Sequence, residues 1–134
     1  MNPYIVASTL KSLMIESTRY IQRDHKFYVI AATLDKRGRI IAIGENSPIK
    51  THPLMKEYAV KAHRAYGQFL HAEVYALVKS QRKVSSIVVI RVNNNGDMAL
   101  AKPCSICMIA INEAKVRNIW YSTQEGTMEY IKNL

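Results

Sequence analysis

The order of elements in the second half of the chain constrains the fold more than any other feature. Residues 85–92 are rich in β-branched side chains and predict a buried strand. Residues 103–114 show helical spacing of apolar side chains after Pro103, and residues 118–122 predict the next strand. A strand, a helix and a strand in this order imply a crossover connection, which is right-handed in nearly all known cases and makes the two strands parallel. The pattern therefore predicts a three-layer α/β sandwich.

The rest of the chain adds a hairpin and further helices. Residues 27–44 contain two strand patterns joined by a tight turn, and they predict an antiparallel hairpin. Residues 98–100 can pair back onto the strand at 85–92, and residues 128–132 can supply a short fifth strand. The fold class that we expect is α/β, a three-layer α/β/α sandwich with a mixed sheet of four to five strands. Three further segments have apolar residues at helical spacing: 4–21, 53–69 and 71–79.

The composition is that of a globular protein. Of the 134 residues, 49% are hydrophobic and 22% are charged, which excludes disordered and low-complexity classes. The length suits one domain and no linker or repeat divides it, so we expect residues 1–134 to form a single domain. No apolar run reaches the roughly 18 to 20 residues that a membrane span needs, and the first residues lack a secretory signal. We expect a soluble, cytoplasmic protein with no membrane partner.

Positive charge is concentrated in the middle of the chain. The net charge is +9, from 19 Lys and Arg against 10 Asp and Glu. Residues 50–83 carry seven Lys or Arg against two Asp or Glu, and seven minus two gives +5 of this total. Such a surplus is typical of a solvated surface, and it also favours phosphorylated or polyanionic partners. Both interpretations stay open at this point.

Two short motifs carry residue types that bind metals. His71-Ala72-Glu73 begins one predicted helix, and Pro103-Cys-Ser-Ile-Cys107 begins another. Cys104 and Cys107 are the two cysteines of the chain, so metal binding or redox chemistry is favoured over a disulfide framework. They are three positions apart in a first helical turn, so both sulfur atoms can point at one ion, and the helix dipole there favours thiolates.

One histidine and two cysteines suit a catalytic zinc site better than a structural one. Structural zinc sites fill all four positions with protein ligands, whereas catalytic sites leave one position for water. Glu73 follows His71 by two positions, where its carboxylate can move protons at the open position. A Cys-x-x-Cys pair alone is more often redox-active or structural, and a non-catalytic zinc domain is the alternative.

The two motifs resemble those of the zinc-dependent cytidine and deoxycytidylate deaminase superfamily, which combine H-x-E with P-C-x-x-C. The resemblance extends to the order of strands and helices from about residue 27 to residue 122. It implies a sandwich of the cytidine deaminase type and a homo-oligomer. The implied chemistry is hydrolytic deamination, in which water activated by Zn²⁺ replaces the ring amino group, so that cytosine becomes uracil or adenine becomes hypoxanthine.

The resemblance also implies a role for individual residues. Glu73 corresponds to the catalytic proton shuttle, and Asn46 and the backbone at Ala72 correspond to substrate contacts. The 24 residues between Asn46 and His71 form a longer segment than compact members of the superfamily have, so substrate rules transfer poorly. The implied zinc ligands are His71, Cys104 and Cys107.

The substrate stays open between a nucleotide and a nucleic acid. Our main hypothesis is a zinc-dependent hydrolytic deaminase of a cytosine nucleotide, converting dCMP to dUMP with release of ammonia. In this hypothesis, basic residues of the 24-residue segment between Asn46 and His71 meet the phosphate. The alternative is a polynucleotide deaminase acting on cytosine in single-stranded DNA or on adenosine in a tRNA loop, where an unpaired base can enter the pocket.

Overall fold

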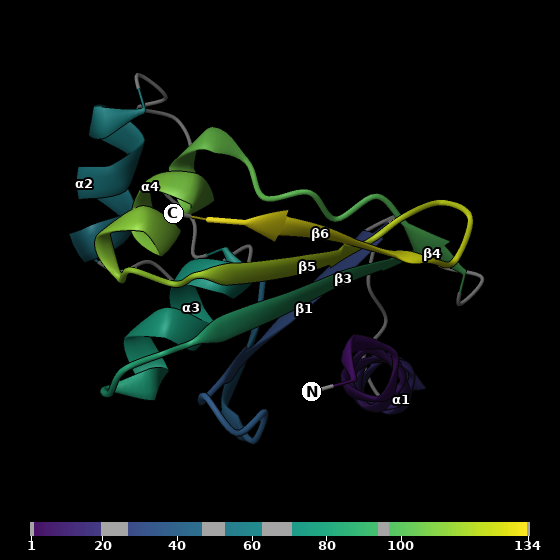
Figure 1. The fold of residues 1–134 in the computed structure, drawn as a ribbon. Helices are drawn as coiled ribbons and strands as arrows, with labels where there is room; N and C mark the ends of the chain where they lie inside the picture. Colours follow the sequence, from purple (N-terminus) through teal and green to yellow (C-terminus); the bar gives the residue numbers. More distant parts are fainter. Residues whose placement is uncertain (1, 20–26, 47–52, 63–70, 94–96, 134) are drawn as a thin grey trace.

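The computed structural model describes residues 2–19, 27–46, 53–62, 71–93 and 97–133 (Figure 1). In this part of the chain, no helix is long and apolar enough to cross a membrane. The elements in chain order are α1 (Pro3–Arg19), β1 (Phe27–Leu34), β2 (Ile40–Glu45), α2 (Pro53–Lys61), α3 (Ala72–Ser80), β3 (Ser86–Asn93), β4 (Met98–Ala99), α4 (Ser105–Glu113), β5 (Asn118–Ser122) and β6 (Met128–Lys132).

The strands form one mixed sheet in the order β2-β1-β3-β5-β6, with β4 paired to β3 beside this row. β1 is antiparallel to both β2 and β3, as predicted for the hairpin, and β3 is parallel to β5, as predicted for the crossover. β6 is antiparallel to β5. The described sheet has six strands instead of the predicted four to five because both short segments, β4 and β6, find pairing partners.

Helices cover both faces of the sheet around its central strand β3 (Figure 1). Successive side chains of a strand point to opposite faces. Val88 and Ile90 belong to a buried cluster with Leu10 of α1, whereas Ile87 and Val89 belong to a second cluster with residues of α3 and α4. These four β3 side chains are completely buried. The predicted three-layer α/β/α sandwich is confirmed.

α2 packs on α3 and α4 instead of on the sheet. Met55 and Tyr58 of α2 share a buried cluster with Val74 of α3 and Ile106 of α4. α2 therefore supports the two helices whose first residues carry the sequence motifs. The helix predicted over 53–69 ends at Lys61 in the structure, and residues 63–70 lie outside the described part of the chain.

α4 begins two positions later than predicted. Cys104 is its N-cap residue, with extended backbone at φ −74° and ψ 174°, so the first helical residue is Ser105. Pro103 therefore precedes the cap instead of occupying the first turn. The difference matters for the site because an N-cap side chain projects from the end of the helix and not from its flank.

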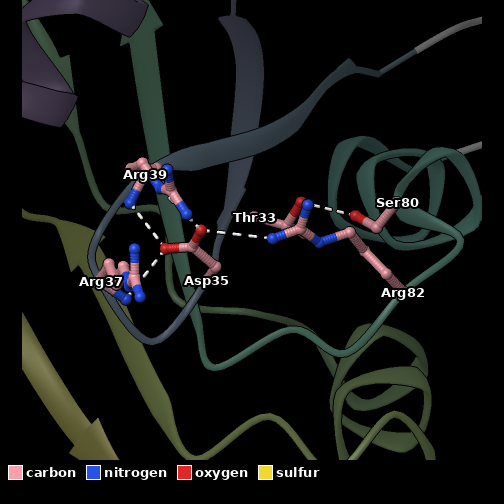
Figure 2. A network of polar contacts seen from close by, with 6 residues as sticks. All are labelled: Thr33, Asp35, Arg37, Arg39, Ser80 and Arg82. Carbon is pink, nitrogen blue, oxygen red and sulfur yellow. Dashed lines mark hydrogen bonds and ion pairs between the residues drawn. The ribbon is translucent and has the colours of Figure 1, made fainter.

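A network of polar contacts lies at the opposite end of α3 from His71 (Figure 2). The carboxylate of Asp35, in the turn after β1, accepts hydrogen bonds from Nε of Arg39 at 3.1 Å and from the side chain of Arg82 at 3.2 Å. Nearby, the buried hydroxyl groups of Thr33 and Ser80 are 2.5 Å apart. These contacts join the β1–β2 turn to the C-terminal end of α3.

Candidate metal centre

The three predicted metal ligands meet where two helices begin. His71 is the N-cap of α3, with φ −79° and ψ 152°, and Cys104 is the N-cap of α4. Neither side chain caps its own helix with a hydrogen bond. Cys107 lies in the first turn of α4 and is completely buried. Two helix N-termini converge here, and their positive ends favour thiolates.

The geometry of the three donor atoms fits a zinc ion. Nδ1 of His71 lies 3.3 Å from Sγ of Cys107 and 3.6 Å from Sγ of Cys104. All three donor atoms lie within 4.8 Å of one another. Zinc–sulfur bonds of about 2.3 Å and zinc–nitrogen bonds of about 2.0 Å at tetrahedral angles separate the donor atoms by roughly 3.6 Å. The residues are therefore positioned as possible zinc ligands.

The two thiols differ sharply in their affinity for a proton. The hydrogen bond from the Cys107 side chain lowers the pKa of Cys104 to about 3, and the hydrogen bond with His71 acts in the same direction. The hydrogen bond with Cys104 and the burial of the group raise the pKa of Cys107 well above its usual value. Zinc binds cysteine as the thiolate, so metal binding at this pair would release protons.

Glu73 is buried beside these ligands in the first turn of α3. Its side chain is 6% exposed. Burial raises the pKa of this carboxyl group, and the negative charge of Cys104 raises it further. A buried carboxyl group with a raised pKa beside a metal centre suits the transfer of protons near neutral pH.

A pocket of about 420 Å³ opens at this centre. Among the predicted site residues, Cys107 alone does not line it, and its side chain is completely buried. The structure thus brings the other five predicted residues to one cavity. The lining residues are Val29, Asn46, His71, Ala72, Glu73, Arg91, Leu100, Ala101, Lys102 and Cys104.

Asn46 is fixed at the pocket wall by β1. Oδ1 of Asn46 accepts a hydrogen bond from the amide of Val29 at 3.0 Å, and the amide of Asn46 donates to the carbonyl oxygen of Val29 at 3.1 Å. Because the side-chain oxygen is engaged, the side-chain NH₂ group is the part of Asn46 that can donate to a ligand.

Two cations of the pocket wall were missed by the sequence analysis. Arg91 belongs to β3, and Lys102 lies in the loop that leads to Cys104. Arg91 lies within the β-branched segment 85–92, and its position two residues after Val89 puts it on the face that carries the metal centre. This alternation was the available signal.

The basic residues of segment 50–83 that the structure describes do not lie at the pocket. None of the described basic residues of segment 50–83 lines the pocket. Lys61 pairs with Glu57 and Glu113, Lys79 donates to the carbonyl oxygen of Ile43 and Arg82 pairs with Asp35. Lys50, Arg64 and the side chain of Lys56 lie outside the described part of the chain.

A comparison with known families distinguishes a catalytic zinc site from a redox-active cysteine pair and from a non-catalytic zinc domain. Residues 6–123 match the family described as "Cytidine and deoxycytidylate deaminase zinc-binding region". The chain belongs to this family. The protein is therefore a zinc-dependent deaminase, a hydrolase, as the resemblance of its motifs predicted. A redox-active cysteine pair and a non-catalytic zinc domain are accordingly set aside.

Two solved structures are similar to this deaminase, and both are of cytidine deaminase from Mycobacterium tuberculosis, the first being a single-site mutant. Each is 20% identical to this chain and covers 86% of it. The alignments span 83% and 82% of those chains, with TM-scores of 0.48 and 0.47. No curated protein matches the chain.

Proposed function

We propose that this protein deaminates a cytosine mononucleotide, converting dCMP and water to dUMP and ammonia. The observation that carries the proposal is that Glu73, His71 and Cys104 line a single pocket, with Sγ of the buried Cys107 3.3 Å from Nδ1 of His71. The pocket volume of about 420 Å³ lies within the range of small-molecule sites, roughly 300–1,000 Å³.

In this proposal, His71, Cys104 and Cys107 hold the zinc ion. The bound ion supplies a Lewis acid that makes water a nucleophile at neutral pH. Glu73 accepts a proton from the attacking water and delivers it to ring nitrogen N3 of cytosine. It then carries the second proton to the departing amino group at C4, which leaves as ammonia. Burial of Glu73 supports this role because a raised pKa lets one carboxyl group both accept and donate near neutral pH.

Asn46 and Ala72 are the proposed substrate contacts. Oδ1 of Asn46 already accepts a hydrogen bond from the Val29 amide. The side-chain NH₂ group of Asn46 is the part that can donate to a sugar oxygen or to the base. Ala72 is the first residue of α3, where backbone N–H groups have no partner within the helix. Its N–H can therefore donate to an acceptor atom of the base.

A polynucleotide deaminase is the second candidate, because the net charge of +9 favours a polyanionic substrate. The two candidates differ in salt dependence. Binding that involves several phosphates weakens steeply as ionic strength rises, whereas a mononucleotide offers one phosphate. A shallow dependence of KM on salt between about 50 and 200 mM supports the mononucleotide.

The deciding experiment is a substrate panel assayed with the zinc-loaded protein. The panel contains dCMP, CMP, deoxycytidine, a cytosine-containing single-stranded DNA oligonucleotide and an RNA hairpin with a loop adenosine. We expect the highest kcat/KM for dCMP. Turnover of an oligonucleotide or the hairpin without turnover of dCMP would overturn the proposal and support the second candidate.

We also infer that residues 1–134 act as one domain, that the protein works in the cytoplasm and that it self-associates. The family match over residues 6–123 supports a single unit. Light scattering coupled to gel filtration measures the oligomeric state, and a mass equal to that of one chain would contradict self-association.

A further inference from the structure

Arg91 is an unusual residue for its position in the sheet. β3 is the central strand, and its side chains before Arg91 are completely buried and apolar from Ile87 to Ile90. Alternation along the strand places Arg91 on the face shared by Ile87 and Val89, which is the face covered by α3 and α4. Arg91 is half-buried, and its Nε atom is shielded from solvent. Arg91 thus lies on the face of the sheet on which the metal centre is found, and it lines the pocket.

The backbone around Arg91 is held in place from two sides. Its Cα partner on β1 is Val29, the residue that binds Asn46. Its amide donates to Oγ of Ser122 at 3.1 Å, and that hydroxyl donates to the carbonyl oxygen of Ala99 at 2.7 Å. Arg91 is therefore fixed between the strand beside Asn46 and the segment that leads to Cys104.

The functional side chains that line the pocket form two groups. Glu73, His71 and Cys104 come from the starts of α3 and α4 and form the part suited to deamination. Arg91 comes from the sheet beside Asn46, and Lys102 comes from the loop. A guanidinium group presents a rigid fork of donors that matches a phosphate, and an ammonium group adds a mobile point charge. This second part suits the anionic end of a nucleotide whose base lies at Glu73.

We propose that Arg91, assisted by Lys102, binds the 5′-phosphate of the substrate and makes the enzyme prefer a nucleotide to a nucleoside. This inference rests on the proposed deamination of a cytosine nucleotide. The sequence places the phosphate at cations of the segment between Asn46 and His71. Of these, Lys61 pairs with Glu113, whereas Arg91 and Lys102 are the cations of the described chain that line the pocket. Arg91 is a specificity-determining residue in this scheme, and it takes no part in moving protons.

The test compares dCMP with deoxycytidine, which lacks the phosphate. For Arg91→Gln we expect kcat/KM for dCMP to fall about 10- to 100-fold, mostly through KM, because a charge-assisted hydrogen bond to phosphate is lost. The value for deoxycytidine should stay within about twofold. Arg91→Lys should recover part of the loss, and Lys102→Gln should show a smaller loss of the same kind. Arg117→Gln, an exposed arginine beside the start of β3, is the matched control and should leave both substrates unchanged.

Equal losses with both substrates would overturn the inference, because Arg91 would then act on the base, the metal centre or the fold. Unchanged kinetics with dCMP would also overturn it. If Arg91→Gln does not fold, Arg91→Lys and Lys102→Gln carry the same comparison. An effect of Arg91 on an internal cytosine of a DNA oligonucleotide, with none on dCMP, would count against recognition of a 5′-phosphate.

A binding measurement separates this inference from the proposed reaction. The dissociation constants of dUMP and deoxyuridine are measured by calorimetry on the zinc-loaded protein and its Arg91→Gln variant. We expect dUMP to bind more tightly than deoxyuridine, and we expect the variant to lose that difference. This result would support phosphate recognition even if no substrate in the panel were deaminated, whereas equal binding of the two by the unaltered protein would overturn it.

Discussion

Gly44 of β2 lies so close to Ala72 of α3 that a methyl group on Gly44 would come 2.7 Å from the Ala72 carbonyl oxygen. The same methyl group would lie 2.5 Å from the amide nitrogen of Ala76. Both neighbours are backbone atoms and cannot rotate away. β2 therefore sets the position of the first turn of α3, and with it the positions of His71 and Glu73.

Replacing Gly44 by alanine should displace α3 from the sheet. Overpacking of this kind costs about 1–3 kcal/mol, and here the displacement also moves His71 and Glu73 relative to α4. We expect a lower free energy of unfolding and weaker zinc binding, measured by denaturant titration and by competition with a chelator. Gly126→Ala is the control, because Gly126 has φ +79° but open space around its Cβ position. It should lower stability and leave zinc affinity unchanged; equal zinc affinity in Gly44→Ala would contradict the positioning role.

The architecture could be predicted because its signals are local. The β-branched residues of β3 and the helical spacing around Cys104 each indicate one element, and a crossover leaves one common arrangement for a strand, a helix and a strand. The six-residue set of site candidates followed from two motifs and a resemblance. The structure brings His71 and the two cysteines together, although 33 positions separate His71 from Cys104.

The cations that line the pocket could not be predicted by counting charges. The density of positive charge along the sequence favours residues 50–83 as the phosphate-binding segment. A cation in that segment can, however, form an ion pair with an acidic residue far away in the sequence instead of contacting a ligand. Lys61 reaches Glu113 of α4, and Arg82 reaches Asp35 of the β1–β2 turn. Arg91 adds little to any local charge count, yet β-sheet alternation directs it toward the site. The contacts that decide such placements are between residues far apart in sequence.

Protonation of Asp35 should lower the free energy of unfolding at acidic pH. The hydrogen bond from the backbone of Arg39 is the largest cause that lowers the pKa of this carboxyl group, and the Arg39 side chain adds to it. A lowered pKa in the folded protein means that the carboxylate stabilises the fold above its usual pKa and loses this effect as the pH falls through the lowered value. We expect Asp35→Asn to be less stable than the unaltered protein at pH 7, and we expect this difference in stability to disappear as the pH falls through the lowered pKa of Asp35. Denaturant unfolding at several pH values measures the gap; Glu125→Gln controls for loss of an exposed charge, and a gap that persists in acid would contradict the assignment.

Removal of a zinc ligand should lower both metal content and stability. His71 and Cys104 begin different helices, so an ion bound between them joins α3 to α4. Bound metal stabilises by about 4 kcal/mol when its free concentration is a thousandfold above Kd. We expect Cys104→Ala to lose zinc by elemental analysis and to unfold at the Tm of the chelated protein. A chelator should lower the Tm of the unaltered protein and of the control Ser105→Ala, and it should not change that of Cys104→Ala. A zinc-loaded Cys104→Ala would refute the ligand assignment.

Glu73→Gln should separate catalysis from metal binding. Glutamine keeps the shape of the side chain and removes its ability to carry a proton, so zinc content and Tm should stay close to those of the unaltered protein. The loss of a positioned general acid and base typically costs about 10²- to 10⁴-fold, and we expect kcat on dCMP to fall by that amount with little change in KM. Glu113→Gln is a matched control, because Glu113 is exposed on α4 and does not line the pocket. Release of ammonia measures the rate; full activity of Glu73→Gln would show that another group moves the protons.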